Sequence, residues 1–312
     1  MRKLLSVIIP AYNEEGMVQK TAEVVSEILN DAKIENEIIF INDGSKDRTW
    51  EKILHVTREK SQVRGVNFSR NFGKEAAMFA GLSYAEGDCC VLIDCDLQHP
   101  PQKIVEMYRL WEQGYEVVEA VKADRGKESF LHKVCAKCFY ALISRATNID
   151  MSKASDFKLL DRRAVDALLQ IKEKHSFFRA LSSWIGFKTI QIEFEVQERT
   201  VGESKWSTWS LMKYAISNIT AFSAVPMQVV TVLGIVMLIA SFLLGVNALY
   251  QKLAGIALDG FTTVILIQLF SGSIIMISLG IIGYYIAKIY EEIKERPRFI
   301  VSEVCGGATD VE

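Results

Sequence analysis

The stretch Leu92–Pro101, LIDCDLQHPP, ends an apolar run with two carboxylates separated by one residue. The run CCVLIDCD predicts a buried strand, and Pro100 and Pro101 then predict the start of a helix, where proline is tolerated. Alternate residues of an extended strand share a face. We therefore expect Asp94 and Asp96 to point the same way, with Cys95 turned aside.

Four further apolar runs predict strands, and helical patterns lie between most of them. The runs are LLSVIIPAY (residues 4–12), NEIIFINDGS (36–45), VRGVNFS (63–69) and YEVVEAV (115–121). Helices are expected over about 16–32, from about 46, and over 73–87. This alternation predicts an α/β fold with a mostly parallel, Rossmann-like sheet. Ligands bind at the carboxyl ends of such strands, so Pro10–Glu14, Asn42–Ser45 and Asp94–Gln98 should converge on one crevice.

Composition excludes several classes of function. The net charge of −2 over 312 residues gives no indication of nucleic-acid binding. The chain has neither a GxGxxG motif after the first strand nor a P-loop motif. Its six cysteines include a lone CxxC, Cys135 and Cys138, which we interpret as unpaired thiols in a reducing compartment. The first apolar run breaks at Pro10, and we expect a strand there rather than a signal peptide.

The C-terminal third differs sharply in composition. No charged residue occurs from Tyr214 to Gln251 or from Gly260 to Ala287. Because a membrane span needs about 20 apolar residues, we predict two transmembrane helices, near Val225–Ala248 and Thr263–Ala287. Two buried helices of a large soluble core are the alternative.

Basic residues around the spans predict their orientation. Lys and Arg lie before the first span and after the second, whereas the connecting loop holds only Lys252. Both termini and the N-terminal domain should therefore face the cytoplasm. Residues 206–223, with Trp206 and Trp209, are consistent with an amphipathic interfacial helix; an ordinary cytosolic helix is the alternative.

The carboxylate pair indicates a metal. Hard oxygen ligands suit Mg²⁺ or Mn²⁺, which use few carboxylates and bridge substrate phosphates. Asp94 and Asp96 are candidate ligands, and Gln98 adds a third oxygen. A purely structural pair of aspartates fits an Asp-x-Asp equally well.

Several motifs in order resemble one family. PAYNEE, INDGSKDRT, NFGKEAAMFAGL and DCDLQHPP resemble the inverting GT-A glycosyltransferases of the dolichyl-phosphate mannose synthase type. The two spans and RTVGESKWS narrow the resemblance to bacterial polyprenyl-phosphate members such as the bactoprenol glucosyltransferases. The similarity runs from about Leu4 to Arg298. It implies that one sugar is transferred from a UDP-sugar to polyprenyl (undecaprenyl) phosphate, with inversion, at the cell membrane. Glucose and N-acetylglucosamine are the favoured sugars.

The resemblance also assigns roles to residues. Pro10, Tyr12, Glu14 and Asp43 would line the nucleotide pocket, and Asp94, Asp96 and Gln98 would hold the metal on the diphosphate. Arg199 and Lys205 would stabilise the leaving diphosphate, Arg125 would bind the acceptor phosphate, and Asp156 matches the position that the family uses in catalysis. The alternatives are a turn with a helix cap for Asp43, a helix N-cap for Asp156, and solvated surface charges for the three basic residues.

These expectations divide the chain into four parts. They are a cytoplasmic GT-A domain (1–205), the interfacial helix (206–223), a two-helix transmembrane domain (224–290) and a cytoplasmic tail (291–312). The final EVCGGATDVE is expected to be disordered. The resemblance also implies that the protein is a homo-oligomer, namely a tetramer. A processive polysaccharide synthase and a non-catalytic membrane scaffold remain alternative functions, and the reaction product would distinguish them.

Overall fold

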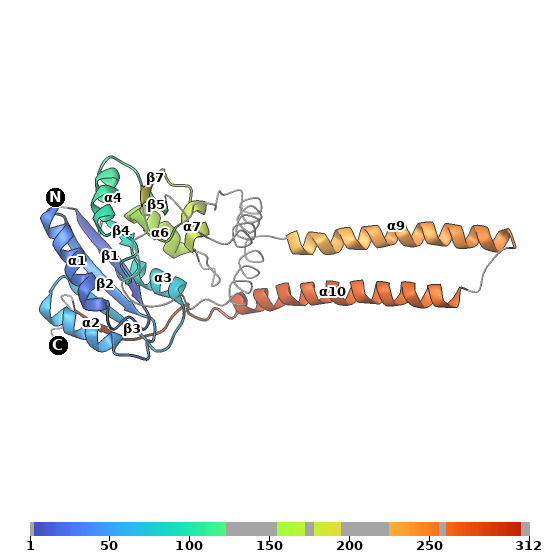
Figure 1. The fold of residues 1–312 in the computed structure, drawn as a ribbon, viewed down its shortest axis with the longest axis horizontal. Helices are drawn as coiled ribbons and strands as arrows, with labels where there is room; N and C mark the ends of the chain where they lie inside the picture. The colour runs from blue at the N-terminus through green and yellow to red at the C-terminus, as the bar shows by residue number, and fades with distance from the viewer. Residues whose placement is uncertain (1–2, 123–154, 172–177, 195–224, 256–259, 307–312) are drawn as a thin grey trace. The chain divides into compact units, whose positions relative to one another are not determined.

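The computed structural model describes residues 3–122, 155–171, 178–194, 225–255 and 260–306 (Figure 1). The chain divides into two compact units, one of Met1–Ser210 with Pro297–Glu312, and the other of Leu211–Arg296. The predicted spans therefore belong to a unit separate from the α/β part.

The first unit is built on an eight-stranded sheet with the order β7-β5-β6-β4-β1-β2-β3-β8. Its strands are β1 (Leu4–Ala11), β2 (Glu35–Asn42), β3 (Val63–Phe68), β4 (Cys89–Leu92), β5 (Val117–Lys122), β6 (Lys158–Asp161), β7 (Thr189–Phe194) and β8 (Val301–Cys305). The five predicted strands correspond to β1 to β5, and the mostly parallel core is confirmed because β2, β1 and β4 pair in parallel, as do β2 and β3.

The order of the strands creates a switch point beside β1. The chain moves outward from β1 to β2 and β3, then returns to place β4 on the other side of β1. Because such a reversal opens a crevice outside the carboxyl ends of the strands, the loops after β1 and β4 lie at the expected ligand site. β6 runs antiparallel to β4, with Lys158 opposite Leu92, so the residues just before β6 reach the same edge.

Helices cover both faces of the sheet. They are α1 (Val18–Asp31), α2 (Thr49–Glu59), α3 (Lys74–Tyr84), α4 (Gln102–Glu112), α6 (Arg162–Gln170) and α7 (Phe178–Trp184). Leu5, Val7 and Ile9 of β1 pack into one core with residues of α1, α2 and α4. Ile8 points to the opposite face, where a Cβ on Gly81 of α3 would lie 2.1 Å from its Cγ2. Glycine at this position therefore lets α3 approach the sheet closely.

The tail departs from the prediction. Residues 303–305 were expected to be disordered, but they belong to β8, which pairs antiparallel with the edge strand β3. Ser69 N–H donates to Ile300 O at 3.0 Å, and Phe299 stacks on Phe68 with ring centroids 5.2 Å apart. An exposed strand edge favours pairing, and the short segment VSEVC was too brief to indicate a strand by its pattern. β6 and β7 were also missed.

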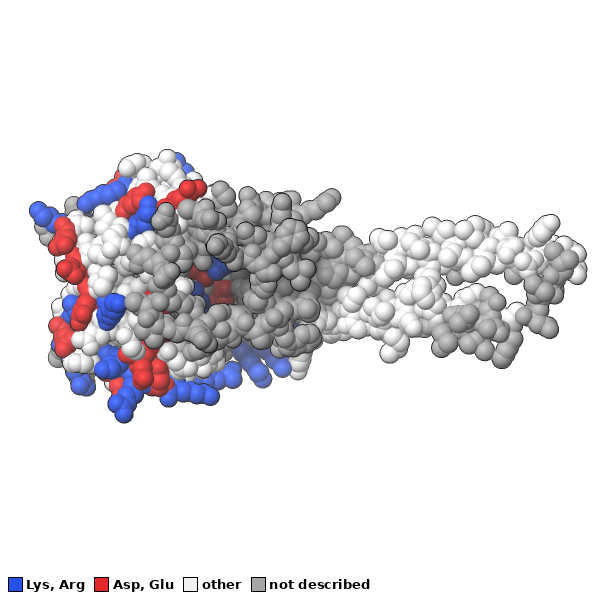
Figure 2. All heavy atoms as spheres, viewed as in Figure 1, with Lys and Arg blue, Asp and Glu red and all other residues white. Residues whose placement is uncertain are grey.

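The second unit contains two long helices, α9 (Val225–Leu253) and α10 (Phe261–Ile293). Their most apolar windows, Val232–Gln251 and Phe270–Ile293, have mean hydropathies of 2.4 and 1.7 and are not buried. Both helices are long and apolar enough to cross a membrane, and their described side chains are almost free of charge in Figure 2. α10 continues beyond the predicted end at Ala287, because Lys288, Glu291 and Glu292 favour helix.

We expect a chain ending at residue 296 to be less stable than one ending at residue 306. The shorter chain lacks β8 and leaves the edge of β3 open, and losing a short ladder costs roughly 2–4 kcal/mol at about 1 kcal/mol per hydrogen bond. Melting temperatures of both chains in the same detergent measure the difference. Equal values would show that β8 does not stabilise the sheet.

Candidate active site

The acidic loop after β4 does not continue the strand. β4 ends at Leu92, and Cys95 and Asp96 lie in a turn followed by Leu97 with a φ of 56°. The predicted extended conformation across Asp94–Asp96 is therefore wrong. Cys95 is buried, as expected, whereas both aspartates are partly exposed at the carboxyl edge of the sheet.

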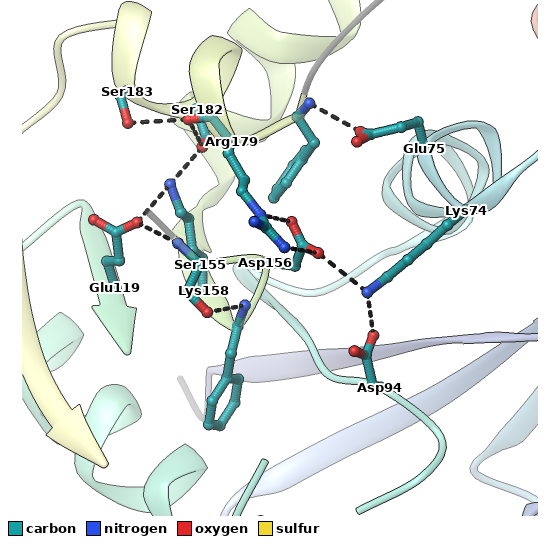
Figure 3. A network of polar contacts seen from close by, with 12 residues as sticks. Lys74, Glu75, Asp94, Glu119, Ser155, Asp156, Lys158, Arg179, Ser182 and Ser183 are labelled. Carbon is teal, nitrogen blue, oxygen red and sulfur yellow. Dashed lines mark hydrogen bonds and ion pairs between the residues drawn. The ribbon is translucent and has the colours of Figure 1, made fainter. Parts of the chain in front are cut away.

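A lysine connects this loop with a distant carboxylate. Lys74, the first residue of α3, places Nζ 2.6 Å from Asp94 Oδ1 and 3.1 Å from Asp156 Oδ2 (Figure 3). Lys74 reaches this edge because α3 begins just after the carboxyl end of β3. Asp156 reaches it because it lies shortly before β6. The sheet topology thus brings together three residues that are far apart in the sequence.

Arg179 of α7 completes the group. Its Nε donates to Asp156 Oδ1 at 2.7 Å, and its Nη2 donates to Asp156 Oδ2 at 2.9 Å. Such two-point contacts between a guanidinium and a carboxylate fix orientation as well as charge. Asp156 is therefore held between two cations. The alternative role of Asp156 as a helix N-cap is wrong, because Asp161 caps α6.

The cations determine the charge of the two aspartates. Burial raises the pKa of Asp94, but the Lys74 ammonium outweighs it and leaves that pKa below its usual value. Burial also raises the pKa of Asp156, and Lys74 with Arg179 reverses the effect and lowers that pKa strongly. Both carboxylates are thus ionised at neutral pH. A carboxylate with so low a pKa is a poor proton acceptor.

The pKa of Glu75, next to Lys74, is shifted in the opposite direction. Its Oε2 accepts the Phe178 N–H at 2.9 Å, which ties the start of α3 to the start of α7. Burial and the nearby charge of Asp156 raise the pKa of Glu75 to about 8. The cluster therefore contains one carboxyl group that holds its proton at neutral pH.

His99 supports the acidic loop by packing. Its ring stacks on Phe157 at 5.0 Å and meets the edge of Phe194 at 5.5 Å between centroids. Its Nδ1 lies 4.0 Å from Asp94 Oδ2, which is beyond hydrogen-bonding range. Burial lowers the pKa of His99, so the ring is neutral. In this structure His99 therefore packs between aromatic rings and makes no hydrogen bond to Asp94.

Asp43 organises the start of α3. Its carboxylate accepts the N–H of Phe72 at 2.6 Å and that of Gly73 at 2.9 Å, and the residue is almost fully buried. Gly44 beside it has a φ of 61°, and a Cβ there would lie 2.3 Å from the backbone of Arg70. The Asp-Gly pair therefore lets two loops meet and anchors the helix that carries Lys74. Asp43 therefore does not cap the helix that follows it, because the N-cap of α2 is Arg48 and the two amides that Asp43 binds lie just before α3.

The loop after β1 is hydrogen-bonded to the loop after β2 and to the start of α2. Asn13 N–H donates to Ser45 Oγ at 2.9 Å, and Glu14 N–H donates to Thr49 Oγ1 at 2.8 Å. Pro10 lies within β1, and Tyr12 is 38% exposed at its end. The predicted nucleotide residues are thus held at the carboxyl edge of the sheet by backbone contacts.

The acidic loop holds carboxylate oxygens of the kind that Mg²⁺ and Mn²⁺ prefer, but too few to form a complete site by themselves. Asp96 is partly exposed, and its Oδ1 accepts the Gln98 N–H at 3.0 Å, which orients the carboxylate. Asp94 is already paired with Lys74. Among the described residues there is no group of three His, Cys, Asp or Glu side chains that could hold a metal. A cation here would need further oxygens from a bound diphosphate, as Mg²⁺ and Mn²⁺ sites commonly use.

Three predicted site residues, Arg125, Arg199 and Lys205, lie outside the described residues, as does the segment 206–223. Lys74 and Arg179 were not predicted. The position of Lys74 at the start of a helix after β3 could have indicated it, because that helix must begin at the ligand edge. No sequence pattern pointed to Arg179.

Comparison with known proteins places this site in a family. Residues 6–169 match the model of glycosyl transferase family 2. An uncharacterized glycosyltransferase of Bacillus subtilis, YkcC, is 40% identical over 303 residues, covering 96% of this chain and 94% of that protein. The prophage bactoprenol glucosyl transferase homolog of Escherichia coli is 35% identical over 302 residues, covering 96% and 99%.

A solved structure shares the fold. Glucosyl-3-phosphoglycerate synthase from Mycobacterium tuberculosis, in complex with Mn²⁺, UDP and glucosyl-3-phosphoglycerate, superposes with a TM-score of 0.50 at 20% identity. The match covers 70% of this chain and 78% of that one. The α/β unit therefore has the GT-A fold that the sequence predicted.

We expect Glu75→Gln to stabilise the protein increasingly, relative to the unchanged chain, as pH rises from about 5 to 8. The folded chain holds the Glu75 proton up to a pKa of about 8, whereas an unfolded glutamate releases it near pH 4.3, the approximate model-peptide value. Ionisation between these values favours the unfolded chain, so the free energy of unfolding falls through this window. Because glutamine cannot ionise, the free energy of unfolding of the variant does not decrease in this way.

Melting temperatures across this pH range measure the effect. Glu51→Gln, at the matching first-turn position of α2, is the control. If the difference between unchanged and Glu75→Gln chains does not vary with pH, Glu75 is ionised in the folded protein and the inferred environment is wrong.

Proposed function

The chain belongs to glycosyl transferase family 2 and is a glycosyltransferase, and on that basis we propose that it glycosylates a membrane lipid phosphate. It would move one sugar, glucose or N-acetylglucosamine, from a UDP-sugar to polyprenyl (undecaprenyl) phosphate, with inversion. The observation that carries the proposal is the presence, in one chain, of a charged GT-A crevice and two candidate membrane helices. Relatives named bactoprenol glucosyl transferases match nearly the whole chain, helices included.

The donor would bind at the carboxyl ends of β1, β2 and β4. The related fold solved with Mn²⁺ and UDP supports a nucleoside diphosphate and a divalent cation. Pro10, Tyr12 and Glu14 would line the base and ribose, with Asp43 holding the loop beside them. Asp96, with Asp94 and Gln98, would hold Mg²⁺ or Mn²⁺. The cation would supply Lewis-acid stabilisation of the departing diphosphate.

The acceptor needs little help from a base. A phosphate monoester has a second pKa of about 6, so its oxygen is mostly deprotonated at neutral pH. Asp156 is held by two cations and has a strongly lowered pKa, which suits a residue that orients Arg179 and Lys74 better than one that takes a proton. Direct attack by the acceptor oxygen on the anomeric carbon inverts its configuration.

The remaining basic residues have proposed roles of the same kind. Arg199 and Lys205 would approach the leaving diphosphate, and Arg125 would bind the acceptor phosphate, because guanidinium and ammonium groups stabilise phosphate charge. The distribution of Lys and Arg around the two spans supports a cytoplasmic location for the catalytic unit and both termini. A homo-oligomer, a tetramer by the family resemblance, belongs to the same proposal.

A transfer assay tests the function. Purified full-length protein is mixed with Mg²⁺ or Mn²⁺, undecaprenyl phosphate and a panel of labelled UDP- and GDP-sugars, and lipid products are separated by chromatography. A single glycolipid from one UDP-sugar supports the proposal and identifies the sugar. A long polymer would point to a processive synthase. Absence of any product, with nucleotide and metal still bound, would favour a scaffold.

We expect Asp96→Ala to lower turnover at least about 10²-fold, the usual scale for losing one electrostatic contact to the leaving group. The fold should survive, because Asp96 is partly exposed and lies in a turn. Lipid transfer and melting temperature are measured together, with Asp31→Ala at the exposed end of α1 as the control. Normal turnover of Asp96→Ala would remove Asp96 from the proposed metal site.

The transfer rate should also fall below about pH 6, because the acceptor phosphate then takes up its second proton. Asp156→Asn should be slower than the unchanged enzyme at every pH and keep the same acid limb. Rates from pH 5 to 8 at saturating donor measure this. Disappearance of the acid limb in Asp156→Asn would instead identify Asp156 as the proton acceptor.

A further inference from the structure

A buried ion pair is linked to the Asp156–Arg179 contact through two serines, Ser155 and Ser182. Lys158 Nζ is 3.0 Å from Glu119 Oε1, and the two side chains are only 1% and 6% exposed. The residues face each other across the antiparallel β5–β6 pair. Burying two charges costs about as much as their attraction returns, so net stability is a weak reason for this pair. The groups that it holds in place are more informative.

The glutamate holds the backbone next to Asp156. Ser155 N–H donates to Glu119 Oε1 at 3.1 Å (Figure 3). Gln191 Nε2 donates to Glu119 Oε2 at 3.0 Å. On the other side of Asp156, Phe157 N–H donates to Ser155 Oγ at 3.1 Å. The backbone on both sides of Asp156 is therefore fixed.

The lysine holds the helix that carries Arg179. Lys158 Nζ donates to Ser182 Oγ at 2.7 Å, and Ser182 Oγ donates to the carbonyl of Arg179 at 3.2 Å. Ser182 lies one turn after Arg179 in α7. Glu119 thus contacts the segment that bears Asp156. Lys158 contacts α7, the helix that bears Arg179.

We infer that Glu119 and Lys158 are positioning residues that set the geometry of Asp156 and Arg179 during transfer. Neither side chain belongs to the substrate crevice, and each acts through a neighbour, Ser155 or Ser182. A displacement of about 1 Å in a reacting group can cost about 10²-fold in rate, so the pair matters for turnover more than for binding. This inference rests on the proposed function.

The main variant is the double substitution Glu119→Gln/Lys158→Met, which removes both charges and retains similar volumes. We expect kcat for lipid transfer to fall at least tenfold, while KM for the UDP-sugar changes less than twofold, because the nucleotide residues lie on other strands. Melting temperature is recorded for each variant. Equal loss of kcat and rise of KM would indicate general disruption and overturn the inference.

A second ion pair, less buried than the first and extended to the exposed Glu86, serves as the control. Arg64 Nη1 lies 3.3 Å from Glu37 Oε2, and Glu37 Oε1 also accepts a backbone N–H, that of Glu86. This pair involves the early part of β2, away from the carboxyl edge. Glu37→Gln/Arg64→Met should lower the melting temperature without a comparable loss of kcat. A similar kcat loss in both double variants would overturn the inference.

Single substitutions at Ser182 keep the inference testable if the double variant does not fold. Ser182→Ala removes the acceptor of the Lys158 bond, and Ser182→Thr retains a hydroxyl. We expect kcat to fall in the alanine variant and to recover in the threonine variant. Failure of threonine to restore the rate, or an alanine variant with unchanged kcat, would contradict the role of this link.

Amide hydrogen exchange separates this inference from the proposed function. Peptides covering 155–161 and 178–184 are followed in ligand-free protein, where no transfer is needed. Exchange in both should accelerate in Glu119→Gln/Lys158→Met beyond the change in the control pair. If the unchanged enzyme transfers no sugar, the proposed function fails while this comparison still tests the link. Unchanged exchange in both peptides would overturn the inference.

Discussion

The ammonium group of Lys74 lies between the carboxylates of Asp94 and Asp156, and the arrangement of the crevice depends on this contact. Two carboxylates that share a site without a cation force one of them to take up a proton. Lys74, helped by Arg179, allows both to remain ionised. Glu75, whose Oε2 accepts the backbone N–H of Phe178, shows the contrasting outcome with its raised pKa.

This contact requires three separate parts of the fold to be correct at once. Asp43 must anchor the two amides just before α3 so that Lys74 points to the edge of the sheet. The antiparallel pairing of β4 and β6 must bring Asp156 alongside Asp94. The α7 helix must present Arg179 from the other side. The crevice is therefore a property of the tertiary structure, although each of its residues is polar and unremarkable in its local sequence.

The sequence could predict the elements whose signals are local. Strands β1 to β5 are short apolar runs, and the polar clusters at Pro10–Glu14 and Asp94–Gln98 follow strand ends, so the sheet and its ligand edge were predictable. The conformation of Asp94–Asp96 was not, because β4 ends at Leu92 and the chain turns at Cys95 and Asp96, a turn that no residue pattern marked. The place of Lys74 at the start of the helix after β3 could have indicated it, whereas Arg179 depends on long-range packing that no local pattern encodes. The resemblance to a family identified Asp156, but not its two cationic partners.

The pairing of β3 with β8 also bears on how the protein is made. Gly65 pairs with Cys305, so the edge of the sheet closes only with residues from beyond both apolar helices. Domains fold largely from the N-terminus during synthesis, and β1 to β7 can assemble while the rest of the chain is still being translated. The last strand must wait until α9 and α10 have left the ribosome. During that interval β3 is an open edge in a nascent chain, a state that favours wrong pairing, and timely membrane insertion of the helices would shorten it.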